Sequence, residues 1–177
     1  MATTIQNFFS RAAEKQFARD FLFRVKQIDI EGVSFNGDSD LVYAKTAQLP
    51  GRNIENKTVN YYGQQFNVPG KSTYPGSEAY SIEFFHDENS ELRTKFEAAS
   101  RAVFNNETST GQYGLPGDGD IITLDVINKD LAPVQTIQLV GASIRDINAI
   151  DYAIADGSGE VLNTTVTFAY HFYRDFS

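Results

Sequence analysis

The chain has 177 residues, no cysteine, and a formal net charge of −8 from 23 acidic and 15 basic residues. This length predicts one domain with a substantial core, and the lack of cysteine excludes disulfides and thiolate chemistry. The acidic balance argues against a nucleic-acid binder, because affinity for phosphates comes mainly from Lys and Arg. No apolar run approaches the roughly 20 residues of a membrane-spanning helix, and the N-terminus lacks a signal-peptide pattern. We therefore expect a soluble chain made in a cytoplasm, without a membrane anchor.

The first 19 residues are predicted to form a helical arm, with the helix itself over residues 3–18. Apolar side chains recur there at helical spacing, and Thr3 with Gln6 matches the capping-box pattern. Phe8, Phe9 and Phe17 share one face of this helix, and they are the candidates for packing between subunits. The face either covers the chain's own sheet or docks on a neighbouring subunit, and a terminal amphipathic helix fits both.

Residues 20–31 and 41–48 are predicted to be strands, with a turn at Asn36, Gly37 and Asp38 between them. Apolar side chains change faces along the first strand. This change predicts a β-bulge, or a strand that passes from one environment to another.

Residues 49–78 are predicted to be an extended loop that begins with Leu-Pro-Gly at 49–51. The stretch 53–67 shows no clear core face, being polar on both faces, yet it contains Val59, Tyr61, Tyr62 and Phe66. Such a strand is either an exposed hairpin or an arm whose second face meets a partner, because alone it would be an edge-pairing liability. The residues that follow predict a loop with little regular structure, from Pro69, Gly70, Pro75 and Gly76.

The second half of the chain is predicted to be mostly strands. A strand over 80–87 leads into a flanking helix over 89–104, whose apolar stripe contains Leu92, Phe96, Ala99 and Val103. A loop over 105–119, antiparallel strands over 120–128 and 134–144, and a polar connection over 146–159 follow; one long strand over 160–176 then crosses the whole domain. The predicted fold is mainly β: an antiparallel barrel or sandwich of about seven strands, with an N-terminal helix and one flanking helix.

No motif predicts catalysis, a cofactor or a metal site. His86 and His171 are the only histidines, and a zinc site would need further ligands. The stretch 63–72 has the wrong glycine spacing for a phosphate loop, and Pro75 prevents the helix that such a loop requires. Residues 118–120 lack the ligand spacing of a calcium loop. We therefore expect a protein that is not an enzyme.

Several features in order and spacing resemble the tail tube proteins of contractile-tailed bacteriophages. They are the Leu-Pro-Gly turn at 49–51, the polar strand after it, the turn at 66–70, and strand 80–87 running into a helix with Arg93 and Phe96. The resemblance implies a structural virion protein whose six-membered rings stack into the inner tail tube, a conduit for genome delivery inside a contractile sheath. The implied partners are further copies of the chain, the tail sheath protein, and baseplate and tail terminator proteins. DNA would pass through the lumen without specific binding, and the protein would be assembled in the host cytoplasm and located in the virion tail.

The resemblance also implies which residues join the rings. The stretch that matches the family's stacking hairpin contains Arg52, Asn53, Glu55, Lys57, Tyr61, Tyr62 and Asn67. The alternative is an ordinary exposed hairpin. A ring of six copies would carry −48, six times the charge of one chain, so salt should screen the repulsion and favour assembly. Assembly that weakens with salt would instead indicate attractive ion pairs through Lys57 and Arg52. An acidic bore would repel DNA phosphates.

Two other functions remain open. A tube protein of a related contractile injection or type VI secretion apparatus would have nearly the same chemistry. A small β-sandwich carbohydrate-binding module is compatible with the 13% aromatic content, although the chain has no Trp, the aromatic residue best suited by size to stacking on sugars.

Overall fold

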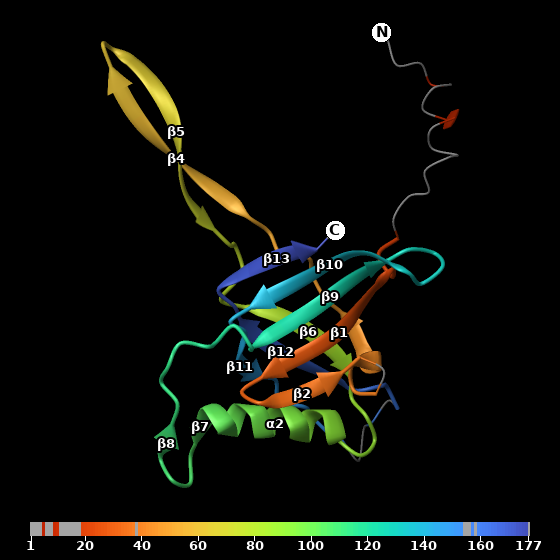
Figure 1. The fold of residues 1–177 in the computed structure, drawn as a ribbon. Coiled ribbons are helices and arrows are strands. Elements are labelled where there is room, and N and C mark those ends of the chain that lie inside the picture. The colour runs from red at the N-terminus through yellow and green to blue at the C-terminus, as the bar shows by residue number, and fades with distance from the viewer. Residues whose placement is uncertain are drawn as a thin grey trace.

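The computed structural model describes residue 5 and residues 9–10, 19–37, 39–153, 157 and 159–176. In this part of the chain, two antiparallel sheets form the body, a two-stranded sheet projects from it, and a long helix lies along one side (Figure 1). The predicted mainly β fold with a flanking helix is confirmed. Across the described ranges, no helix combines the length and apolar character needed to cross a membrane. Most of the predicted N-terminal helix, including Phe8 and Phe17, lies outside the described residues.

The first sheet has five strands in the order β13-β10-β9-β1-β2. They are β1 (Phe23–Ile30), β2 (Val33–Asn36), β9 (Ile121–Ile127), β10 (Pro133–Val140) and β13 (Phe172–Phe176). The register of β1 against β9 shifts between Val25 and Gln27, so a bulge lies at Lys26. The predicted bulge is confirmed, and it explains why the apolar residues of β1 change faces.

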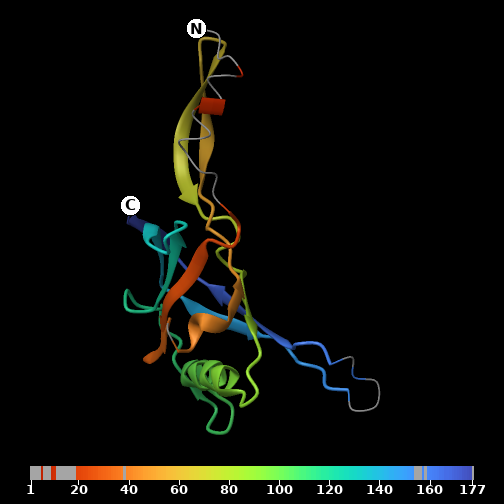
Figure 2. The same ribbon diagram turned by 90° about the vertical axis from the view of Figure 1, so that its right-hand side faces the viewer.

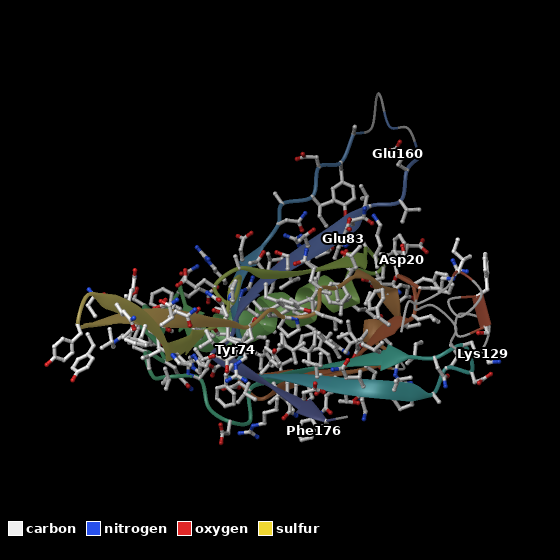
Figure 3. All side chains as sticks on the ribbon, turned by 90° about the horizontal axis from the view of Figure 1, so that it is seen from above. Asp20, Tyr74, Glu83, Lys129, Glu160 and Phe176 are labelled. Atoms are coloured by element: carbon white, nitrogen blue, oxygen red, sulfur yellow. The ribbon has the colours of Figure 1, made fainter. Side chains whose placement is uncertain are left out.

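The second sheet has four strands in the order β11-β12-β6-β3. They are β3 (Ala44–Thr46), β6 (Tyr80–Phe85), β11 (Ser143–Ile147) and β12 (Asn163–Ala169). Alternate residues of β6 and β12 are fully buried between the sheets, as period-two strands require. Figure 3 shows side chains filling the space between the two sheets.

Two strands expected to be continuous are each divided between the sheets. The strand predicted over 134–144 is β10 and then β11, and the strand predicted over 160–176 is β12 and then β13. Both segments pass from one sheet to the other at the same corner. There the His171 backbone N–H donates to the Val140 carbonyl at 3.0 Å. The alternation of side chains continues on both sides of the corner, so the pattern alone indicated unbroken strands.

Two further predictions near the start of the chain need correction. The strand expected over 41–48 is a 3₁₀ turn, η1 (Leu41–Tyr43), followed by the short strand β3. Residues 33–35 had no predicted structure and Asn36 was expected in a turn, but residues 33–36 form β2 by turning back on β1 through Glu31 and Gly32, both at positive φ. Four residues are too few for alternation to be visible in the sequence.

The flanking helix is α2 (Glu91–Val103), and it closes one side of the sandwich. Its predicted apolar stripe is confirmed for Leu92, Phe96 and Ala99, which are buried, whereas Val103 is half-buried. The Phe96 ring lies 4.4 Å from Phe35 of the first sheet, and 5.4 and 6.0 Å from Phe84 and Phe168 of the second. This aromatic cluster ties the helix to both sheets.

Two connections extend from the body. After α2, the strands β7 (Phe104–Asn105) and β8 (Thr110–Gly111) form a short ladder inside the predicted loop. The chain between β11 and β12 extends away from the sheets (Figure 2). Tyr152 fixes its base, because the Tyr152 hydroxyl lies 3.0 Å from His86 Nε2.

Candidate interaction surface

The projecting sheet, called the arm here, consists of β4 (Asn53–Tyr61) and β5 (Gln64–Thr73). Its pairing runs from Asn53 opposite Thr73 to Tyr61 opposite Gln64. The arm leaves the body near Tyr74 and extends well beyond it (Figures 1 and 3). Every residue of β4 is exposed, and so is every residue of β5 before Thr73. Nothing in the described part of the chain therefore covers the arm.

Pro69 and Gly70 were expected in a loop, and this prediction is wrong, because both residues lie inside β5. The register of the arm shifts between Ile54 and Asn56, which places a bulge where Gly70 faces Glu55. A Cβ atom on Gly70 would approach the Glu55 carbonyl oxygen to 2.8 Å, so the bulge requires glycine. Proline is tolerated beside it because each strand of a two-stranded sheet is an edge.

Tyr62 and Gly63 form the tip of the arm. Both have positive φ, +47° and +76°, which matches the mirror-image turn that joins paired strands in tight hairpins. Glycine adopts this conformation freely, whereas a tyrosine in it costs roughly 1–2 kcal/mol. Tyr62 is 90% exposed, and its ring stands edge-on to Tyr61 at 4.6 Å. The tip therefore holds two aromatic rings in the open, one of them on a strained backbone.

The pairing of β4 with β5 sorts the arm into two different faces. Opposite residues on antiparallel strands share a face. One face carries the pairs Lys57–Val68, Val59–Phe66 and Tyr61–Gln64, and the other carries Asn56–Pro69, Thr58–Asn67 and Asn60–Gln65. The expectation that the segment is polar on both faces is therefore wrong.

We name the first of these the apolar face, defined by Val59, Tyr61, Phe66 and Val68. These four side chains keep between 45% and 66% of their surface exposed. An isolated two-stranded hairpin is marginally stable in water, and three or more strands or a packing partner are usually needed. The arm thus presents an apolar surface and unpaired edges at the place where the chain has least support of its own.

The arm is basic on an acidic chain. Residues 52–73 contain three basic residues and one acidic residue, a net charge of +2, which leaves −10 for the rest of the −8 chain. Glu55 is paired with Lys71 at 3.5 Å, and Arg52 Nε donates to Ser72 Oγ at 3.1 Å. No ion pair joins Lys57 to another described residue.

The predicted stacking residues are all on or beside the arm, but they do not share one face. Lys57 and Tyr61 are on the apolar face, Asn67 is on the polar face, and Tyr62 is at the tip. The remaining three, Arg52, Asn53 and Glu55, are at its base. Sequence reasoning missed Phe66 and Val68 as site residues. Of the three candidate packing residues near the N-terminus, the structure describes Phe9, which is 66% exposed.

A second candidate contact lies along β1. β2 pairs with β1 only over Gln27–Ile30, so the half before Gln27 has no strand on that side among the described residues. A groove of about 740 Å³ runs beside this half, bounded across from it by Asn36, Gly37, Leu41, Val42 and Ala44. An open strand edge beside a groove can accept an extended segment by main-chain hydrogen bonding.

The polar clusters inside the body hold the fold together. The His86 ring nitrogens lie beside three hydroxyls, with Nδ1 at 3.0 Å from Thr164 Oγ1 and Nε2 at 3.0 Å from both Ser90 Oγ and the Tyr152 hydroxyl. His171 packs at the corner beside Gly141. The described residues include no group of three His, Cys, Asp or Glu side chains placed to hold a metal ion.

Among the described residues, Asp125 is the most buried carboxylate. Burial acts to raise its pKa, but hydrogen bonds from Thr136 Oγ1 at 2.6 Å and from Arg24 at 2.8 and 2.9 Å outweigh burial and lower the pKa. The Asp125 side chain has no exposed surface, whereas the Arg24 side chain keeps 47% of its surface exposed. This network links β1, β9 and β10 and stabilises the five-stranded sheet.

Comparisons with known proteins place the fold. No family model and no curated sequence matches the chain. A chain in the cryo-EM structure of the anti-feeding prophage baseplate, 6-fold symmetrised, matches with a TM-score of 0.63 at 17% identity, covering 92% of this chain and 97% of that one. A chain in the tube-terminating cap of the anti-feeding prophage matches at 0.60 and 13% identity, covering 92% and 93%. A chain in the sheath–tube complex of the extracellular contractile injection system PVC matches at 0.52 and 13% identity, covering 99% of each.

These identities are low, so the likeness concerns the fold. The chain shares, over nearly its whole length, the fold of proteins found in contractile injection particles.

Proposed function

We propose that the chain is a self-assembling structural component of a contractile injection particle, of the type that forms rings stacked into a tube. The observation that carries the proposal is the apolar face of the arm. Val59, Tyr61, Phe66 and Val68 share this face and remain about half exposed on a hairpin that no other described segment covers. A second copy of the chain supplies the missing surface.

The arm joins unlike surfaces, because the arm of one copy docks on the body of the next. Such a heterologous contact does not close in a pair, so repeated copies form a ring or a filament. The open half of β1 beside its groove provides a second region in which an extended strand of a neighbour can pair. Two contact regions with different directions are what a stack of rings requires. The six-fold symmetry named for the neighbouring baseplate structure supports rings of six.

The arm residues predicted from sequence have the following roles in this proposal. Tyr61 and Lys57 contact the next copy through the apolar face, Tyr62 does so at the tip, and Arg52, Asn53 and Glu55 lie where the arm meets its own body. Asn67 faces the other way, toward solvent or the lumen. The finer reading as a bacteriophage tail tube that conducts DNA rests on the sequence resemblance, with the sheath, baseplate and terminator as further partners.

A second candidate is a component at one end of the particle. The baseplate and cap structures give TM-scores of 0.63 and 0.60, above the 0.52 of the sheath–tube complex. An end component would form one ring or a few rings, whereas a tube component would polymerise without a fixed length. The length distribution of the assemblies therefore separates the two candidates.

Negative-stain electron microscopy of the purified protein tests the proposal. We expect rings or hollow tubes for the natural sequence, and their loss when Val59 and Phe66 on the apolar face are both changed to Ser. The matched control changes Asn60 and Gln65, the neighbouring pair on the polar face, to Ser, and it should leave assembly intact. Strictly monomeric natural protein up to millimolar concentration would refute the proposal and move attention to the carbohydrate-binding alternative, which a glycan array would test.

A further inference from the structure

We propose that the arm docks through Lys57 onto a carboxylate of a second copy, so that salt weakens arm-mediated contacts while it strengthens contacts between bodies. This inference rests on the proposed function and adds the chemistry of the surface that receives the arm. It replaces a single salt response, expected from net charge, by two responses of opposite sign.

The first step concerns where the charge lies. The arm carries +2 and the rest of the chain −10. Two bodies side by side therefore repel, whereas an arm and a body attract. Between surface charges, the range of both effects falls from about 10 Å at 0.1 M salt to about 3 Å at 1 M.

The second step concerns Lys57 itself. Lys57 lies opposite Val68 on the apolar face, one pair away from Val59 and Phe66. Docking of this face removes water from the Lys57 ammonium group, and no described side chain of its own chain is paired with it. A desolvated, unpaired ammonium group is strongly unfavourable, so the receiving surface must present a carboxylate.

The third step identifies the occupant. The other two cations of the arm differ from Lys57, because Lys71 already faces the Glu55 carboxylate at 3.5 Å and Arg52 precedes β4 at the base of the arm, outside the apolar face. A partner for Lys57 must combine an apolar surface with free carboxylates. The body of a second copy has the excess of carboxylates, with 22 acidic and 12 basic residues outside residues 52–73. Charge complementarity thus selects the chain's own body.

The experiment measures assembly of the full chain in 0.05 to 1 M sodium chloride, by sedimentation and by electron microscopy of the pelleted particles. We expect stacks to separate into single rings as salt rises. At low salt, Lys57→Gln should raise the protein concentration needed for stacking by roughly a hundredfold or more, because it leaves the receiving carboxylate desolvated and unpaired. Lys57→Glu should raise it further and should reverse the salt response, whereas Lys57→Arg should behave as the natural sequence does.

Lys129→Glu is the matched control. Lys129 is an exposed lysine in the turn between β9 and β10, and its substitution changes the net charge by the same amount as Lys57→Glu. Stacking that grows stronger with salt, or that Lys129→Glu weakens as much as Lys57→Glu does, overturns the inference. Stacks that form but respond neither to salt nor to Lys57 also overturn it and leave the proposed function standing. Natural protein that forms no assembly at any salt concentration refutes the proposed function itself, and this inference with it.

Discussion

Truncation of Phe66 to Ala should separate assembly from folding. Phe66 is 48% exposed in the single chain, where it lies opposite Val59 in the arm. Full burial of a phenylalanine side chain contributes roughly 1.5–3 kcal/mol, so burial of the exposed half on docking contributes about 1 kcal/mol to each contact. About 1 kcal/mol corresponds to a roughly fivefold change in affinity. Because the arm projects from the body, the free energy of unfolding of the body should change by less than about 0.5 kcal/mol.

Two measurements check this prediction. Sedimentation gives the protein concentration at which half of the chain is assembled, and urea unfolding of the unassembled chain gives the free energy of unfolding. Phe85→Ala is the control, since Phe85 is the same residue type, is 40% exposed, and lies on β6 of the body. The reasoning is refuted if Phe66→Ala assembles at the natural concentration, or if Phe85→Ala weakens assembly equally.

Three further substitutions test other parts of the structure. Gly141→Ala should destabilise the body by about 2–4 kcal/mol in urea unfolding, because Gly141 has a φ of +67° and a Cβ there would lie 2.1 Å from the His171 ring. A loss below about 0.5 kcal/mol, the level of a neutral surface change, would contradict this. Asp125→Asn should cost about 1–3 kcal/mol at pH 7. The pKa of Asp125 is lowered in the folded state, so the stabilisation from its carboxylate is present above the unfolded pKa of about 3.9 and is lost as pH falls through the folded pKa. A difference in free energy of unfolding between the natural protein and Asp125→Asn that stays constant down to about pH 2 would count against the network. Tyr62→Asn should ease the strained turn by up to about 1 kcal/mol and yet weaken assembly, and stronger assembly would show that the tip makes no contact.

Features that depend on neighbouring residues were predictable from the sequence. The apolar stripe of α2 follows from helical spacing, and the bulge at Lys26 follows from apolar residues that change faces within one strand. Both are local consequences of backbone period. The sheet corner at residues 170–171 was not predictable in this way, because the side chains of β12 and β13 alternate as they would along one strand. Only the packing of two sheets makes the chain turn there.

The apolar face of the arm lies between these cases. In β4, the residues that share this face are Val59 and Tyr61 together with Lys57 and Glu55, so the strand has no apolar side when it is considered alone. The face emerges only when Phe66 and Val68 are placed opposite β4. That placement depends on a tight turn at residues 62–63, and Tyr62 is an uncommon residue for such a turn. An Asn-Gly pair at the same position would have revealed the hairpin and its register.

The features of the arm are unfavourable for an isolated chain and favourable in an assembly. Tyr62 holds a strained backbone, the apolar face is open to water, and both strands have unpaired edges. The aromatic cluster around Phe96 stabilises the body without any help from the arm. The unfavourable contributions fall on the single chain, whereas the compensating contacts come from a second copy, so assembly should be cooperative. Docking of an arm orders a hairpin that is otherwise only marginally stable. The hydrogen-exchange protection of β4 and β5 should therefore rise sharply on assembly, while that of β6 and β12 stays nearly constant.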